Sequence, residues 1–201
     1  ATTNESQFFR GGAFTLGNAA WSGSAFAGAV TETLHTAFGG NVTFRQARFS
    51  IGMQAVGYGE YGDSATAGEK WRSLVHPDLL DASVSYQAIV GKALLFGEAA
   101  VNGNGKTAAL QAALVPVTPV LKMSVLLRHY ATGYQSPMGS GFRASSGDCG
   151  ELGAYLAGHL VVSGNVEADL FYDYYRLRWL SYLTDAPVQG MDAGLSLTCR
   201  L

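Results

Sequence analysis

The chain has 201 residues, of which 48% are hydrophobic and only 14% are charged, and its formal net charge is −2. So neutral a balance argues against nucleic acid as a partner, because nucleic-acid-binding surfaces carry a basic patch. No apolar run reaches the roughly 18 residues that a membrane-spanning helix needs.

Apolar and polar residues alternate along most of the chain with the two-residue period of a β-strand. The pattern predicts ten strands, at 8–17, 21–34, 42–58, 79–90, 92–102, 107–117, 120–131, 149–162, 165–178 and 190–201. Helical periods are almost absent. We therefore predict an all-β chain.

The clearest alternation lies between Asn165 and Tyr174. One face of that strand would carry only apolar and aromatic side chains: Val166, Ala168, Leu170, Tyr172 and Tyr174. The other face would carry Glu167, Asp169 and Asp173. Because the same two-faced pattern recurs in other segments, it favours a barrel with lipid outside and a polar lumen.

The predicted connections differ in length. Short turns are predicted near 38–41, 90–91, 118–119 and 163–165, and long connections at 59–78, 131–148 and 178–190. Each long connection follows an odd-numbered predicted strand, so in a meander all three lie on one side. Bacterial outer-membrane barrels show this asymmetry, with short periplasmic turns and long extracellular loops.

Aromatic residues gather at the predicted long-connection end of the strands. A girdle at a membrane interface is expected there, made of Trp21, Tyr58, Trp71, Tyr130, Tyr174 and Trp179. The partners that this pattern predicts are the lipid bilayer and lipopolysaccharide.

Together these patterns predict an antiparallel up-and-down transmembrane β-barrel in the bacterial outer membrane. Residues 1–201 would form a single barrel domain of about ten strands, or part of a larger barrel. Ten strands would leave both ends of the chain on the periplasmic side. The start, Ala1–Glu5, has no features of a signal peptide, so we expect either that a signal was removed or that the chain belongs to a longer one.

From about Leu94 onward several motifs occur in a fixed order. They are Leu95–Ala99 with the hairpin Asn102–Lys106, Leu127–Tyr130 with Tyr134-Gln135, Gly150–Tyr155, Asp173–Leu180 and Asp185–Pro187. In these motifs the chain resembles the C-terminal barrel of a family of Bacteroidota outer-membrane proteins. Members often carry helix-hairpin-helix, ComEA-like repeats upstream. No such repeat is present in this sequence, so the resemblance implies the barrel and not DNA binding.

By the two-residue alternation, the charged residues in and near these motifs lie on the strand face that would point into the lumen. They are Glu98, Arg128, Glu151, Asp169 and Asp173. Opposite charges inside a barrel can pair across strands and fill the lumen. The alternative is a constriction that selects a ligand or solute.

The sequence contains no convincing catalytic pair. The one conceivable catalytic pair is His129 with Asp148 or Ser146. The strand alternation places His129 on the face that would contact lipid. The histidines and the two cysteines, Cys149 and Cys199, lack the spacing of metal ligands. We therefore predict no enzyme activity, no metal and no cofactor.

Three classes of function remain. The first is a structural or partner-binding component of an outer-membrane assembly, alongside other outer-membrane proteins or lipoproteins. The second is a porin-like passive pore for small solutes, and the third is a soluble β-barrel that binds a small apolar ligand. Ten strands enclose a lumen that side chains can largely fill. This favours the first class.

Overall fold

The computed structural model of the chain describes residues 9–30, 35–60, 80–134, 142, 150–178 and 186–200. These residues form eleven strands and no helix. The strands are β1 (Phe9–Gly17), β2 (Trp21–Val30), β3 (His35–Gln46), β4 (Phe49–Glu60), β5 (Leu80–Val90), β6 (Ala93–Asn102), β7 (Thr107–Pro116), β8 (Leu121–Tyr130), β9 (Glu151–Ser163), β10 (Val166–Leu177) and β11 (Gln189–Cys199).

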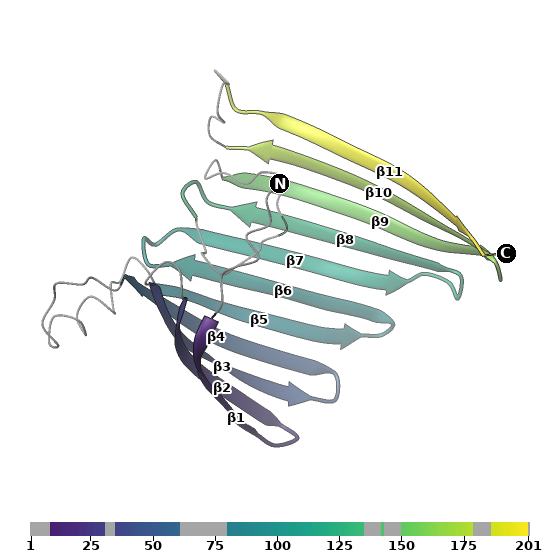
Figure 1. Cartoon of the computed structure of the whole chain (residues 1–201). Coiled ribbons are helices and arrows are strands. Elements are labelled where there is room, and N and C mark those ends of the chain that lie inside the picture. The colour runs from purple at the N-terminus through teal and green to yellow at the C-terminus, as the bar shows by residue number, and fades with distance from the viewer. Residues whose placement is uncertain are drawn as a thin grey trace, which may run out of the picture. The chain divides into compact units, whose positions relative to one another are not determined.

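The strands form one sheet in which each strand is hydrogen-bonded to the next along the chain, from β1 to β11 (Figure 1). Neighbouring strands from β1 to β4 and from β7 to β11 pair antiparallel. The all-β, antiparallel, up-and-down architecture is therefore confirmed. In this order β1 and β11 are the first and the last strand.

Among the described residues, no helix is long and apolar enough to cross a membrane.

By contact density the chain divides into two compact units. One comprises Ala1–Val84 with Ala100–Gly105, and the other comprises Ser85–Ala99 with Lys106–Leu201. The division passes through β5 and β6. Four strands, β1 to β4, belong to the first unit, and β7 to β11 belong to the second.

The sequence predicted ten strands, and this count was wrong. Glycine and asparagine at 38–41 indicated a turn, but these residues lie inside β3. The turn falls instead at Ala47-Arg48, between β3 and β4. Because the count is odd, β1 begins at one end of the strands and β11 finishes at the other, so the two ends do not share a side.

The predicted asymmetry of the connections holds in the corrected strand order. The long ones join β4 to β5, β8 to β9 and β10 to β11, so each follows an even-numbered strand. The connections after odd-numbered strands are all short turns. We call the two ends of the strands the long-connection end and the short-turn end.

Strands β8 to β11 have two chemically different faces, which the cross-strand register defines. The polar face carries Lys122, Arg128, Glu151, His159, Glu167, Asp169, Asp173 and Asp192. The apolar face carries large hydrophobic side chains that are exposed, namely Met123, Val125, Leu127, Leu152, Leu156, Leu160, Val162, Leu170, Tyr172, Tyr174, Met191, Leu195 and Leu197. Arg176, near the end of β10, is the charged exception on the apolar face.

Strands β1 to β4 repeat this division within their own unit. Thr15, Ser24, Asn41 and Gln54 lie directly opposite one another in a row across the four strands. The Asn41 amide donates a hydrogen bond of 2.8 Å to the Ser24 hydroxyl. The opposite face exposes the large hydrophobic residues Phe14, Leu16, Trp21, Val42, Phe49 and Met53.

The faces of β7 are assigned by its register with β8 and do not follow from its composition. Leu110 lies directly opposite Arg128, on the polar face, whereas Gln111 lies opposite Leu127, on the apolar face. The Gln111 side-chain oxygen accepts a 2.5 Å hydrogen bond from the Tyr86 hydroxyl. A polar side chain on the apolar face is thus satisfied by a neighbour.

Large side chains lie over glycines at several cross-strand pairs. A methyl group on these glycines would collide with the facing side chain, or at Gly39 press tightly against it. Each pair is directly opposite in the register: Phe26 with Gly39, Phe38 with Gly57, Arg128 with Gly153, Phe171 with Gly194, and Tyr175 with Gly190. In each pair the larger residue is on the earlier strand. This close approach is one use of the chain's 26 glycines, almost twice the average usage of about 7%.

Candidate functional site

Three adjacent strands bring a buried arginine and two carboxylates together. Arg128 is the third residue from the end of β8, which ends at Tyr130. Glu151 begins β9 directly opposite Tyr130, and Asp173 on β10 lies opposite Tyr155 of β9. Because all of these positions have the same parity, their side chains share the polar face.

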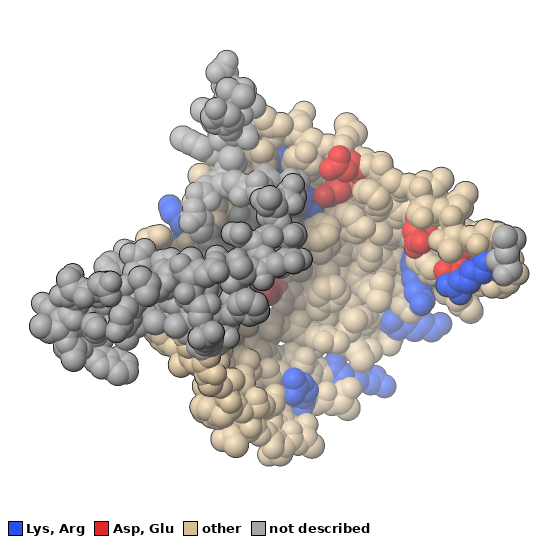
Figure 2. Space-filling view, in the orientation of Figure 1, with Lys and Arg blue, Asp and Glu red and all other residues tan. Residues whose placement is uncertain are grey.

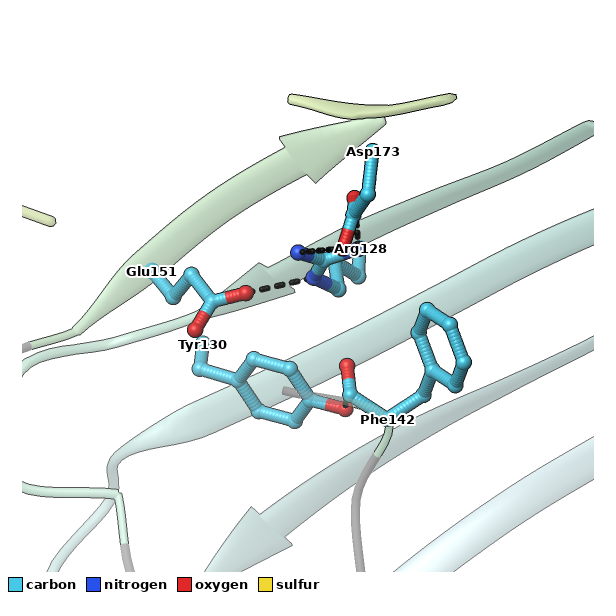
Figure 3. A network of polar contacts seen from close by, with 5 residues as sticks. All are labelled: Arg128, Tyr130, Phe142, Glu151 and Asp173. Atoms are coloured by element: carbon cyan, nitrogen blue, oxygen red, sulfur yellow. Dashed lines mark hydrogen bonds and ion pairs between the residues drawn. The ribbon is translucent and has the colours of Figure 1, made fainter. Parts of the chain in front are cut away.

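The geometry is that of a closed ion cluster (Figure 3). The Arg128 Nε donates to Glu151 Oε1 at 2.5 Å, while Nη1 and Nη2 donate to the two Asp173 oxygens at 2.7 and 3.1 Å. The side chains of Arg128, Glu151 and Asp173 are 0%, 2% and 13% exposed. One guanidinium therefore serves two carboxylates, and the cluster carries a formal charge of −1.

Two glycines make room for this cluster. A side chain at Gly153 would collide with the Arg128 guanidinium. Gly150, just before β9, has a φ of +64°, a conformation that favours glycine. A side chain at Gly150 would also meet the backbone of Thr132. Both positions demand glycine for reasons of space.

Phe142 closes one side of the cluster. Its ring centroid lies 5.2 Å from the central guanidinium carbon of Arg128, within the range of a cation–π interaction. Its carbonyl oxygen accepts a 3.3 Å hydrogen bond from the Tyr130 hydroxyl. One residue of the connection between β8 and β9 is thus held on the polar face by two contacts (Figure 3).

An aromatic tract continues from Phe142 along the polar face. The Phe142 and Tyr155 rings meet edge to face at 5.2 Å, and Tyr155 stacks on Phe171 at 6.1 Å. Towards the short-turn end, His159 Nδ1 lies 2.7 Å from Asp169 Oδ1. Figure 2 shows further acidic and basic side chains gathered near the C-terminus, where β9 and β11 end and β10 begins.

The five predicted lumen charges do not form one cluster. Arg128, Glu151 and Asp173 come together as expected. Asp169 binds His159 instead, because it lies four residues before Asp173 on the same strand face. Glu98 is an exposed residue of β6 and is not one of the two carboxylates that bind Arg128.

Two predicted girdle residues need correction. Tyr130 is 6% exposed and lies on the polar face, so it cannot belong to an outward girdle. Trp21 is exposed and contacts the Phe44 ring at 4.8 Å, but it starts β2 at the short-turn end. The missed turn at Ala47-Arg48 had reversed the predicted direction of every earlier strand.

The remaining girdle residues are placed only in part. Tyr174 is exposed on the apolar face near the long-connection end, and its hydroxyl donates to the Gln189 side chain at 3.3 Å. Tyr58 lies near the end of β4 at the same end. Trp71 and Trp179 lie outside the described residues.

Sequence reasoning missed three contributors to the site. Phe142 sits in a long connection with no periodic pattern, so no signal pointed to it. The pairing of His159 with Asp169 and the tract from Tyr155 to Phe171 could have been found from strand parity, once the register of β9 and β10 was known.

The histidine considered for catalysis has another partner. His129 Nε2 lies 2.9 Å from Arg178 Nη1. Asp148 and Ser146 lie outside the described residues. Within the described ranges, no three His, Cys, Asp or Glu side chains are grouped as a metal site would require.

Comparison with known proteins adds little to this geometry. No family model matches the chain. No curated protein matches it. One solved structure, described as "Unveiling the Mechanism Behind the in-meso Crystallization of Membrane Proteins", is similar with a TM-score of 0.37 and 9% sequence identity, covering 95% of this chain and 77% of that chain.

Proposed function

We propose that this chain is a transmembrane β-barrel of the bacterial outer membrane, with a non-enzymatic role as a structural or partner-binding component of an assembly. Its apolar face would contact lipid and lipopolysaccharide, and its polar face would line the lumen. Other outer-membrane proteins or lipoproteins are the partners that we propose.

The observation that supports this proposal is the division of faces on β8 to β11. On β10, Leu170 is 58% exposed while Asp169 and Asp173 lie on the opposite face. A soluble sheet buries its apolar face and hydrates its polar one. Here the large hydrophobic residues are exposed on strand after strand, as lipid-facing residues of a barrel are.

The strand lengths agree with this proposal. On the apolar face of β9, exposed residues run from Leu152 to Leu160. Eight residue steps span roughly 27 Å at the rise of a β-strand. A tilted strand of 9–11 residues crosses a bilayer, so the apolar band has the required length.

The closed ion cluster favours the structural role over the pore. Arg128 is fully buried between Glu151 and Asp173 and is covered by Phe142. The cluster keeps a formal charge of −1, but its charged groups are buried and hydrogen-bonded to one another, so it fixes adjacent strands and presents little charge to a passing ion. This supports a filled lumen at the long-connection end.

Extraction tests the membrane half of the proposal. The protein should stay in the membrane pellet at alkaline pH and require detergent for solubility. It should also migrate differently on gels before and after heating. A chain that is released without detergent and binds an apolar dye or fatty acid would instead be the soluble barrel.

Conductance tests the choice between scaffold and pore. In planar bilayers the purified protein should give little current. Large, stable currents from the unmodified protein, with ion selectivity altered by Asp173→Asn, would establish the pore instead.

A further inference from the structure

The apolar face of β8 to β11 carries charge at one end only. In the cross-strand register Arg176 shares a row with His129, Leu152 and Gln189. Leu152 is the last exposed leucine of β9 towards the long-connection end, so this row borders the apolar band. The structure describes all four strands, and at their short-turn end the same face has no charged residue.

A second arginine reaches this row from just beyond the end of β10. The backbone N–H of Arg178 donates to the Gly150 carbonyl at 3.1 Å, and its side-chain Nη1 lies 2.9 Å from His129 Nε2. A guanidinium has no acceptor, so His129 Nε2 accepts this bond. Because His129 lies on the apolar face, the contact places the Arg178 side chain there as well, beside Arg176.

This end of the apolar face has a surplus of hydrogen-bond donors. Both arginines are exposed, and among the described residues the side chain of Arg176 has no partner and that of Arg178 has only His129. The Gln189 oxygen accepts from the Tyr174 hydroxyl, which leaves the Gln189 amide as a further donor. No Asp or Glu lies on the apolar face of these four described strands. The complement of such a surface is an anion with several oxygens.

The depth of the arginines indicates which anion. The band of exposed leucines from Leu160 to Leu152 ends at the row of Arg176, and Arg178 lies two residues further out. In a barrel this border is the level of the lipid headgroups, where long basic side chains extend out of the hydrocarbon. Guanidinium groups bind phosphate through paired, charge-assisted hydrogen bonds. An anion that approaches this face at headgroup depth is a lipid phosphate.

We propose that Arg176 and Arg178 bind a phosphate group of lipopolysaccharide, whose acyl chains pack on the apolar face below them. In the proposed orientation the long-connection end is at the cell surface, where lipopolysaccharide forms the outer leaflet. This inference rests on the proposed function, which it deepens by naming the residues and the chemical group through which the lipid is held.

The test measures lipid binding by the purified chain folded in detergent micelles, with bound lipid counted by native mass spectrometry. Lipid A should bind at least about tenfold more tightly than dephosphorylated lipid A with the same acyl chains, as expected for two or more charge-assisted hydrogen bonds. It should also bind more tightly than phosphatidylglycerol. Arg176→Gln combined with Arg178→Gln should abolish both preferences.

A matched control removes two cations from the polar face of the same unit. Lys122 is exposed there, and Arg200 pairs with Glu167 near the short-turn end. Lys122→Gln combined with Arg200→Gln should leave both preferences unchanged. Arg176→Gln alone, which breaks no contact among the described residues, should still weaken lipid A binding, so the test stands even where the double variant fails to fold.

A preference for phosphorylated lipid A that is lost only with the apolar-face arginines supports the inference. Equal binding of dephosphorylated lipid A or of phosphatidylglycerol overturns it, and so does a preference that survives in the Arg176→Gln, Arg178→Gln variant. Displacement of lipid A by an equal concentration of inorganic phosphate would show that the site takes a free anion instead. All of these results leave the proposed function intact, whereas release of the protein from the membrane without detergent refutes the proposed function itself.

Discussion

At the scale of single residues, Arg128 organises the polar face. It joins three strands through two carboxylates and holds Phe142 against the sheet. A buried charge is tolerated when it is paired and its hydrogen bonds are satisfied, and removing one partner leaves the other uncompensated. The stability lost on removing Arg128 would therefore come mainly from the two carboxylates that would remain without their counter-charge.

Replacing Arg128 by Ala should destabilise the folded protein by about 3–5 kcal/mol, because the nearly inaccessible Glu151 carboxylate loses its counter-charge. Denaturant unfolding in detergent micelles measures the change. Lys122→Ala removes an exposed cation from the same face of the same strand and serves as the control. Equal effects of the two substitutions would contradict the assigned role.

Gly153→Ala tests the space beneath the guanidinium. The added methyl group would meet the Arg128 side chain, so we expect a loss of about 1–3 kcal/mol from overpacking. Gly158→Ala, on the same strand, would meet no atom closer than 4.0 Å and should be nearly neutral. The same unfolding measurement compares them, and a reversed order would disprove the packing.

At the scale of the strand, alternation explains most of what could be predicted from sequence. The assignment of Leu170 and Asp169 to opposite faces required only a period of two. The identity of β3 could not be predicted in the same way, because Gly39 and Gly40 resemble a turn. Both glycines pair with residues of β2 and β4, and the Phe26 ring lies over Gly39, so these contacts come from other strands.

Leu170→Arg, on the apolar face of β10, should cost roughly 2–4 kcal/mol if that face meets lipid at mid-membrane. Asp169→Asn, one residue away on the polar face, loses an exposed pairing with His159 and should cost under about 1 kcal/mol. Heat-modifiable gel mobility after refolding into lipid reports both. Similar losses would mean that the two faces do not differ in environment.

The candidate site was predictable to a similar extent. Strand parity brought Arg128, Glu151 and Asp173 to one face, and the register then made them neighbours. Parity could not exclude Asp169, whose separation from Arg128 depends on its position along β10. Phe142 depends on a contact between a connection and the sheet, for which no local pattern exists.

At the scale of the whole molecule, connection length distinguishes the two ends of the strands. A single missed turn changed the strand count from ten to eleven and moved Trp21 to the opposite end. It did not alter the grouping of the long connections, because all of them follow the missed turn. The common side of the long connections could therefore be predicted from the sequence more reliably than the total number of strands.

Cysteine labelling on intact cells tests this sidedness. With both native cysteines replaced by serine, Gln189→Cys at the long-connection end should react with an impermeant maleimide. Arg48→Cys and Gly164→Cys, in two different short turns, should react only after the outer membrane is permeabilised. The opposite pattern would invert the proposed orientation. Labelling of only one of the two turns on intact cells would show that the short turns do not lie on one side of the membrane.

The same sidedness determines where the chain can accept foreign sequence. A short turn such as Gly91-Lys92 fixes the register of two strands at once, so an insertion there shifts side chains between faces. The segment between Glu60 and Leu80 is long, so an insertion there would leave the register of the two flanking strands unchanged. A peptide epitope grafted there would be carried at the long-connection end of the strands, which is the cell surface in the proposed orientation.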